Sequence, residues 1–127
     1  MERVRFITYR GRQILFMDYS ELQDPKEIVR GIEQAKEMVA EQPENSVLGL
    51  IYVRDANTTN AVKEAMKHAA VHNKPYIRAT AVVGMSPVQR LIYEAVNLFS
   101  KRGNSCAFDD LGPAKEWLGE QDAAVAV

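Results

Sequence analysis

The spacing of apolar residues changes along the chain between a strand period and a helix period. Residues 3–9 and 13–19 are rich in aromatic and branched side chains, and the RGR segment between them supplies a glycine for a tight reversal. These two segments predict an antiparallel hairpin. Short apolar runs at 46–53, 78–84 and 105–108 predict three further strands, the first two with the continuous pattern of strands covered on both faces.

Between these runs the apolar residues recur at helical spacing. Asp24, Pro25 and Glu27 predict an N-cap, a first helical position and the returning carboxylate of a capping box, and the helix continues to about Gln42. A second helix is predicted over 59–72. The side chains that should face the core from these two helices are Ile28, Ile32, Ala35 and Val39, and Val62, Met66 and Ala69.

Two more helices follow. Ser86 is the predicted N-cap of the first, Pro87 its first helical position and Gly103 its terminator. The last helix, over 112–120, should dock Trp117 and Leu118. The apolar face predicted for the helix after Ser86 is Val88, Leu91, Ile92, Ala95, Val96 and Phe99.

These elements predict an α/β fold with the order ββαβαβαβα, a mixed sheet of about five strands and four helices packed on it. Strands 46–53 and 78–84 should be neighbours. Residues 1–121 are expected to form a single domain, and residues 122–127 a flexible tail.

Charge and composition limit the range of partners. Among 127 residues, 16 Lys and Arg nearly balance 17 Asp and Glu, which argues against a strongly basic nucleic-acid face or a polybasic membrane patch. The single cysteine rules out an intrachain disulfide and fits a reducing compartment. No apolar run is long enough to span a bilayer. We therefore expect a cytoplasmic protein without membrane anchoring or nucleic-acid binding.

Candidate chemistry lies at the exits of the third and fourth strands, because ligands in open α/β sheets bind outside the carboxyl ends of strands. Each exit leads into a helix, whose free N–H groups and positive dipole end favour an anion. The predicted site residues are Asp55, Asn57, Thr58 and Thr59 at one exit, and Gly84, Met85 and Ser86 at the other.

A purely structural interpretation of these residues is also open. Asn57, Thr58 or Thr59 could simply cap a helix, Gly84 could simply allow a turn, and Ser86 could simply cap the next helix.

Other reactive residue types point to no enzyme. His68 and His72 share a helix face without a carboxylate motif, and are expected to be solvated. Cys106 is expected to be a small buried hydrophobe. The sequence shows no glycine-rich phosphate loop, nucleophile elbow or cysteine cluster. No metal, cofactor or catalytic activity is predicted.

Three segments together resemble the SpoIIAA-like branch of the STAS fold over about residues 3–120. They are the strand ending in RDANTT, the block NKPYIRATAVVGMSPVQRLIYEAVNLFS and the closing AFDDLGPAKEWL. The resemblance implies a small mixed α/β domain that works through protein contacts or bound small ligands. In the anti-sigma-factor antagonists of this fold, Asp-Ser-Ser-Gly opens the second helix and its second Ser is phosphorylated.

This chain departs from that phosphorylation motif. The four positions fall on Asp55, Ala56, Asn57 and Thr58, so an amide replaces the switch hydroxyl. Thr58 and Thr59 are the remaining candidate phosphorylation sites, where a phosphate would add nearly two charges at a helix N-terminus.

The predicted function is a non-enzymatic regulatory or protein-interaction module with its working surface at those two strand exits. The alternative is a small-molecule or lipid-binding protein with an apolar pocket between the sheet and the helices, beside Leu91, Tyr93 and Phe99. A homodimer is also predicted, because the hairpin has more apolar positions than one buried face needs. Those positions are Phe6, Ile7, Tyr9, Leu15, Phe16 and Met17.

Overall fold

The computed structural model describes residues 2–100 and 104–121, without the side chains of Phe99 and Ser100. Within these ranges the chain forms five strands and four helices in the predicted order ββαβαβαβα. The elements are β1 Val4–Tyr9, β2 Arg12–Asp18, α1 Pro25–Ala40, β3 Val47–Tyr52, α2 Asn60–Asn73, β4 Ile77–Val83, α3 Pro87–Ser100, β5 Ser105–Phe108 and α4 Leu111–Gly119. The predicted tail 122–127, the terminator Gly103 and the Phe99 side chain lie outside the described residues.

The strands form one mixed sheet in the order β1-β2-β3-β4-β5. β1 and β2 are antiparallel, whereas β2 to β5 run parallel to one another. The predicted neighbours β3 and β4 are paired, with Tyr52 opposite Val83 at their carboxyl ends. The exits of β2, β3, β4 and β5 therefore lie along the same edge of the sheet.

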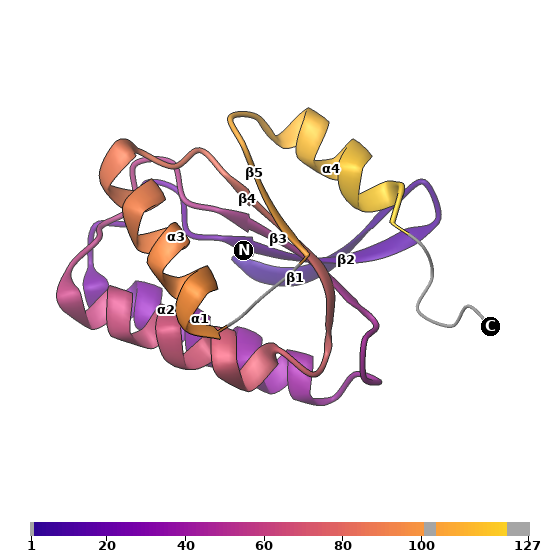
Figure 1. The fold of residues 1–127 in the computed structure, drawn as a ribbon, viewed down its shortest axis with the longest axis horizontal. Coiled ribbons are helices and arrows are strands. Elements are labelled where there is room, and N and C mark those ends of the chain that lie inside the picture. The colour runs from indigo at the N-terminus through magenta and orange to yellow at the C-terminus, as the bar shows by residue number, and fades with distance from the viewer. Residues whose placement is uncertain (1, 101–103, 122–127) are drawn as a thin grey trace.

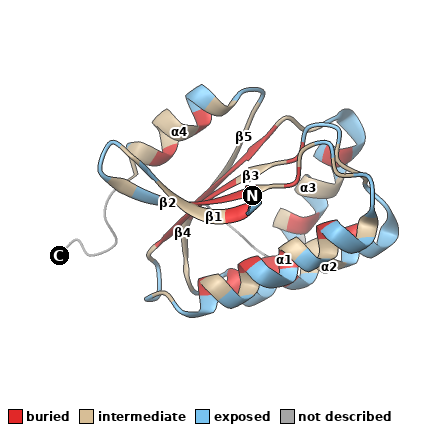
Figure 2. Ribbon diagram, turned by 180° about the vertical axis from the view of Figure 1, so that it is seen from behind, coloured by how far each residue is buried: buried red, intermediate tan, exposed pale blue. Residues whose placement is uncertain are grey.

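Helices cover both faces of this sheet. Figure 1 shows α1, α2 and α3 on one side of the strands and α4 on the other. The buried residues of the two sides form separate hydrophobic clusters. In Figure 2 the buried residues lie in the central strands and on the helix sides that face them, while the outer sides of α1 and α2 are exposed.

The surplus of apolar positions in the hairpin is used within the chain. Leu15 and Met17 of β2 belong to the cluster beneath α1, while Ile14 and Phe16 point to the opposite cluster beneath α4. Ile14 and Leu15 are both fully buried. Because helices cover both faces of the sheet, packing within one chain accounts for the apolar residues of the hairpin. These residues therefore no longer support the predicted homodimer.

Helix α1 follows its predicted pattern closely. Its buried residues are the four predicted ones, Ile28, Ile32, Ala35 and Val39. Asp24 is the N-cap, and its Oδ1 accepts a hydrogen bond from Lys26 N at 2.9 Å. The predicted return bond from Glu27 is wrong: among the described hydrogen bonds, Glu27 contributes only its backbone N–H, which donates to the carbonyl of Asp24.

The predicted apolar face of α3 is correct only in part. Val96 is buried and Ile92 is half-buried, as expected, but Val88 and Leu91 are 58% and 68% exposed and Ala95 is also exposed. The polar Gln89 is buried in their place, at 9% exposure. The helix is therefore rotated about its axis from the predicted orientation. The hydrogen bonds of Gln89, described below, explain this rotation.

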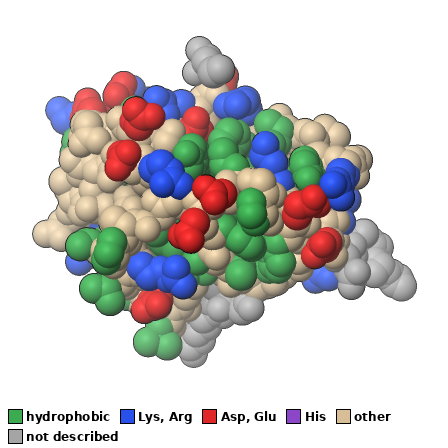
Figure 3. Space-filling view, turned by 90° about the horizontal axis from the view of Figure 1, so that it is seen from above, with side chains coloured by type: hydrophobic (Ala, Val, Ile, Leu, Met, Phe, Trp, Pro, Cys, Tyr) green, Lys and Arg blue, Asp and Glu red, His purple; other side chains and the backbone are tan. Residues whose placement is uncertain are grey.

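The surface carries mixed charge where it is seen in Figure 3, which views the face above α4. There, Lys and Arg side chains are intermingled with Asp, Glu and hydrophobic side chains. No helix within residues 2–100 and 104–121 combines the length and apolar character that a membrane crossing requires.

Candidate functional site

The exit of β3 is fastened to the loop that follows β2. The N–H of Glu21 donates to the carbonyl of Arg54 at 2.8 Å, and the N–H of Asn57 donates to the carbonyl of Leu22 at 2.9 Å. The side-chain amide of Asn57 also donates to the carbonyl of Gln23 at 3.0 Å. The predicted site residue Asn57 thus holds two loops together.

Asp55 makes the sharp turn at this exit. Its φ is 59°, in the left-handed region, which aspartate tolerates better than most residues. Its carbonyl accepts a hydrogen bond from the Gln23 side chain at 2.7 Å. Its carboxylate is on an exposed residue and does not line the cavity described below.

The exit of β4 passes close to Arg54. Gly84 has a φ of 82°, and a Cβ atom at this position would lie 3.0 Å from the Cβ of Arg54, so both backbone conformation and space favour glycine. Arg54 also reaches the residue that follows β5, where its guanidinium donates to the carbonyl of Asp109. A hydrogen bond to the Tyr52 hydroxyl raises the pKa of Arg54.

Gln89 joins the two exits, and sequence reasoning missed it. Its Nε2 donates to the carbonyl oxygens of Val53 and Ala56, both at 3.1 Å. Its Oε1 accepts from Ser86 N at 2.8 Å, while Gln89 N donates to Ser86 Oγ at 3.2 Å. The last two bonds form a capping box, whose Ser-x-x-Gln spacing was visible in the sequence.

The N-terminus of α2 differs from those of α1 and α3, because no side chain caps it. Thr59 is the N-cap residue, but its hydroxyl makes no capping hydrogen bond. Asn57 Oδ1 accepts instead from Thr59 N, at 2.9 Å, before the first helical residue. Thr59 thus holds the predicted N-cap position without a side-chain bond, and Asn57 makes its bond to the N–H of the N-cap residue itself. The first turn of α2 also contains no acidic residue.

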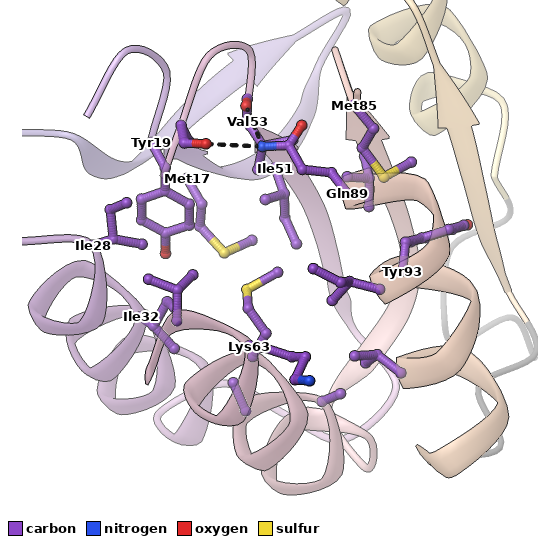
Figure 4. Close-up of a pocket in the computed structure, with 18 of the residues that line it drawn as sticks. Met17, Tyr19, Ile28, Ile32, Ile51, Val53, Lys63, Met85, Gln89 and Tyr93 are labelled. Carbon is purple, nitrogen blue, oxygen red and sulfur yellow. Dashed lines mark hydrogen bonds between the residues drawn. The ribbon is translucent and has the colours of Figure 1, made fainter. Parts of the chain in front are cut away.

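A cavity of about 120 Å³ lies between the sheet and helices α1, α2 and α3. Figure 4 shows side chains from the strands and from all three helices pointing into it. Of the predicted site residues, Asn57, Thr58 and Met85 line it, whereas Asp55, Thr59, Gly84 and Ser86 do not. Apolar lining residues include Met17, Ile51, Val53 and Val82 from the strands, Ile28 and Ile32 from α1, Val62, Met66 and Ala69 from α2, and Ile92 from α3.

Tyr19 brings a polar atom into this apolar space. It is 3% exposed, and its ring lies so close to α1 that a Cβ on Gly31 would approach it to 2.8 Å. In Figure 4 its hydroxyl points toward Ile28 and Ile32. Among the described residues no hydrogen bond to this hydroxyl is formed, and burial raises the pKa of Tyr19. An unpartnered buried hydroxyl is uncommon in folded proteins.

The remaining candidate residues are dispersed. His68 is exposed, and His72 Nδ1 lies 2.8 Å from Asn73 Oδ1. Cys106 is a half-buried free cysteine of β5. Within the part of the chain that the structure describes, no three His, Cys, Asp or Glu side chains are grouped so that they could hold a metal ion.

Comparisons of the chain with protein-family models, with curated proteins and with solved structures gave no match. We therefore infer function from the geometry of this site.

Replacing Gln89 should uncouple the two strand exits. Gln89→Leu removes three side-chain hydrogen bonds. The carbonyl of Val53 keeps its bond from Ala56 N, but the carbonyl of Ala56 and the N–H of Ser86 lose their partner, so we expect a loss of about 3 kcal/mol in the free energy of unfolding. Urea denaturation measures it. Gln34→Leu, at an exposed position of α1, should change stability by less than about 0.5 kcal/mol. A loss below about 1 kcal/mol for Gln89→Leu would contradict the bridging role.

Removing the Tyr19 hydroxyl should not destabilise the protein. Because this hydroxyl has no hydrogen bond among the described residues, Tyr19→Phe should be neutral or stabilising by up to about 1 kcal/mol. The matched control is Tyr93→Phe, which removes the bond of 2.8 Å between the Tyr93 hydroxyl and Ser105 Oγ and should cost about 1 kcal/mol.

The same variant tests the effect of burial on ionisation. Because the pKa of Tyr19 is raised in the folded state, the unfolded chain loses this proton first, near the ordinary tyrosine value of 10.0. The free energy of unfolding is therefore unaffected by this group below that pH, and it falls as the pH rises above it. The free energy of unfolding, measured at several pH values across this range, should fall less steeply for Tyr19→Phe than for the wild type. An equal dependence on pH in the two proteins would refute the effect.

Proposed function

We propose that this protein is a non-enzymatic regulatory module that binds a small apolar ligand in the cavity beneath α1, α2 and α3. The observation that carries the proposal is the cavity itself, with its apolar lining and its rim at the exits of β3 and β4. An engineered apolar cavity of roughly 150 Å³ binds benzene or xenon, so this volume suits a single ring or a short hydrocarbon chain.

The rim of the cavity supports a preformed site. Asn57 fastens the β3 exit to the preceding loop, and Gln89 fastens it to α3. Loops held by such bonds lose little conformational freedom when a ligand enters, which favours binding. Thr58 and Met85 belong to the same rim, and both lie outside the helices and strands.

The regulatory part of the proposal comes from the resemblance to the STAS fold. The element order, the mixed five-strand sheet and the paired β3 and β4 are compatible with that fold. In this proposal the β3 exit corresponds to the switch segment of the anti-sigma-factor antagonists, with a ligand in the role of the phosphate.

Phosphorylation remains part of the same proposal at Thr58 and Thr59. Both residues are exposed at a helix N-terminus that has no side-chain cap, where a phosphate would be favoured electrostatically. Because Thr58 also lines the cavity, a phosphate there would stand at its rim and hinder ligand entry. Intact-mass analysis showing both threonines unmodified in the native source would count against it.

A second candidate function is protein contact through α3, favoured by an exposed apolar stripe on this helix. Val88, Leu91 and Leu98 are 58%, 68% and 82% exposed, and Ala95 lies between them at helical spacing. Clustered exposed apolar residues mark interaction surfaces more often than single ones do. This exposed stripe on α3, and not the hairpin, is therefore the surface through which we expect a homodimer to form.

Filling the cavity should abolish binding of a neutral apolar probe. We expect 1-octanol at ten times its Kd to stabilise the wild type by about 1.4 kcal/mol in thermal unfolding, because it binds only the folded state. Ala69→Leu places a larger side chain in the cavity and should remove the effect, whereas Ala61→Leu, at an exposed position of α2 outside the lining, should keep it. Equal responses of the two variants would exclude the cavity as the site.

The α3 stripe is tested by self-association. The wild type should dimerise at high concentration in light-scattering measurements, and the double variant Val88→Gln, Leu91→Gln should stay monomeric because it removes apolar area from the contact. Val71→Gln is the matched control, since Val71 is 50% exposed on α2 and lies outside the stripe. A wild type that stays monomeric would end this proposal.

A further inference from the structure

The N-terminus of α2 borders the cavity and carries the partial positive charge of the helix dipole. The first N–H groups of α2, those of Asn60, Ala61 and Val62, receive no oxygen from the side chains of residues 57–59. The first turn carries no acidic residue, so the positive end of the helix dipole is not compensated locally. Val62 of this turn lines the cavity.

Lys63, the fourth residue of α2, adds a full positive charge to the cavity lining. Among the described residues that line the cavity, Lys63 is the only charged one. Figure 4 shows its side chain extending from α2 toward α3. Lys36 and Lys67 pair with Glu33 and Glu64 on their own helices, but no ion pair is formed by Lys63 within the described residues. Within residues 2–100 and 104–121 its ammonium therefore has no anionic partner.

Nearby carboxylates do not supply that partner. Glu64 is engaged with Lys67 at 3.6 Å, and Asp55 is exposed outside the cavity lining. A cation beside a helix N-terminus is electrostatically unfavourable, since both are positive. An anion at this position would relieve the repulsion and compensate both charges.

Tyr19 is an independent indication that the cavity receives a ligand. Its hydroxyl, on a residue 3% exposed, lines the same cavity and has no hydrogen-bond partner among the described residues. The apolar lining between Tyr19 and Lys63 excludes a ligand that is polar throughout, such as a sugar. The lining requires a hydrocarbon body, and the rim requires a negative group.

Resting on the proposed function, we propose that the ligand is a short amphipathic carboxylate whose hydrocarbon part fills the cavity and whose carboxylate pairs with Lys63 at the N-terminus of α2. One ammonium and a set of helix N–H groups match a single negative charge. The cavity volume of about 120 Å³ holds roughly the six carbons of a benzene-sized body, and the open rim takes the head group.

The test compares octanoate with 1-octanol, which share a hydrocarbon chain and differ in charge. Isothermal titration calorimetry of the full chain should show octanoate binding roughly tenfold more tightly than 1-octanol. Lys63→Met keeps most of the apolar stem and removes the charge, so octanoate should lose roughly tenfold in affinity while 1-octanol is unchanged. Lys67→Met, one turn further along α2 and outside the cavity lining, should leave both affinities unchanged.

The outcomes separate this inference from the proposed function. Equal affinities of the wild type for octanoate and 1-octanol would overturn the carboxylate while leaving the cavity as an apolar site. An equal loss of octanoate affinity in Lys63→Met and Lys67→Met would overturn the role of Lys63. Failure of both probes to bind any form of the protein would overturn the proposed function itself. The wild-type comparison needs no variant, so a folding defect in Lys63→Met would not obscure it.

Discussion

The buried side-chain amide of Gln89 is the constraint on which the arrangement of the site depends. Its Nε2 must reach the carbonyls of Val53 and Ala56, and its Oε1 must reach the N–H of Ser86. Because a buried amide without these partners would cost about 1–3 kcal/mol per unsatisfied group, the helix has little freedom to turn this residue outward. Gln89 thus fixes both the start of α3 and its rotation about its own axis.

Two further features follow from that rotation. Ile92 and Tyr93 turn toward the sheet and line the cavity, while Val88 and Leu91 turn to solvent. The cavity remains open because α2 presents small side chains, Ala69 and Ala70, where larger ones would close it. The side chains that line an unfilled cavity lose dispersion contacts with neighbouring atoms. The proposed ligand would restore these contacts.

Sequence reasoning predicted the fold because strand and helix periods are local properties. The continuous run at β3 and the stripe of Ile28 and Ile32 on α1 can be interpreted without knowing any long-range contact. The rotation of α3 could not be predicted in this way, since Leu91 and Val88 satisfy the helical apolar pattern equally well. Only the pairing of Gln89 with carbonyls more than thirty residues away decides between the two faces.

The candidate site was predicted in part for the same reason. Parallel strand exits must share an edge, so Asn57 and Met85 could be placed together from topology alone. Tyr19 and Lys63 could not, because in sequence a buried tyrosine and a helical lysine have no distinguishing feature. The Ser-x-x-Gln spacing before α3 was the available signal for Gln89, although it indicates a capping box and not a bridge to β3.

The three helices that cover one face differ in how their N-termini are capped. Asp24 caps α1 and Ser86 caps α3 with side-chain oxygens, whereas Thr59 leaves the first turn of α2 without one. A side-chain cap contributes about 1 kcal/mol, and hydroxyl and amide groups suited to the task lie within two residues of this helix start. Asn57 instead directs its oxygen to Thr59 N and its amide to the neighbouring loop. The first N–H groups of α2 therefore stay available in the helix whose Lys63 lines the cavity.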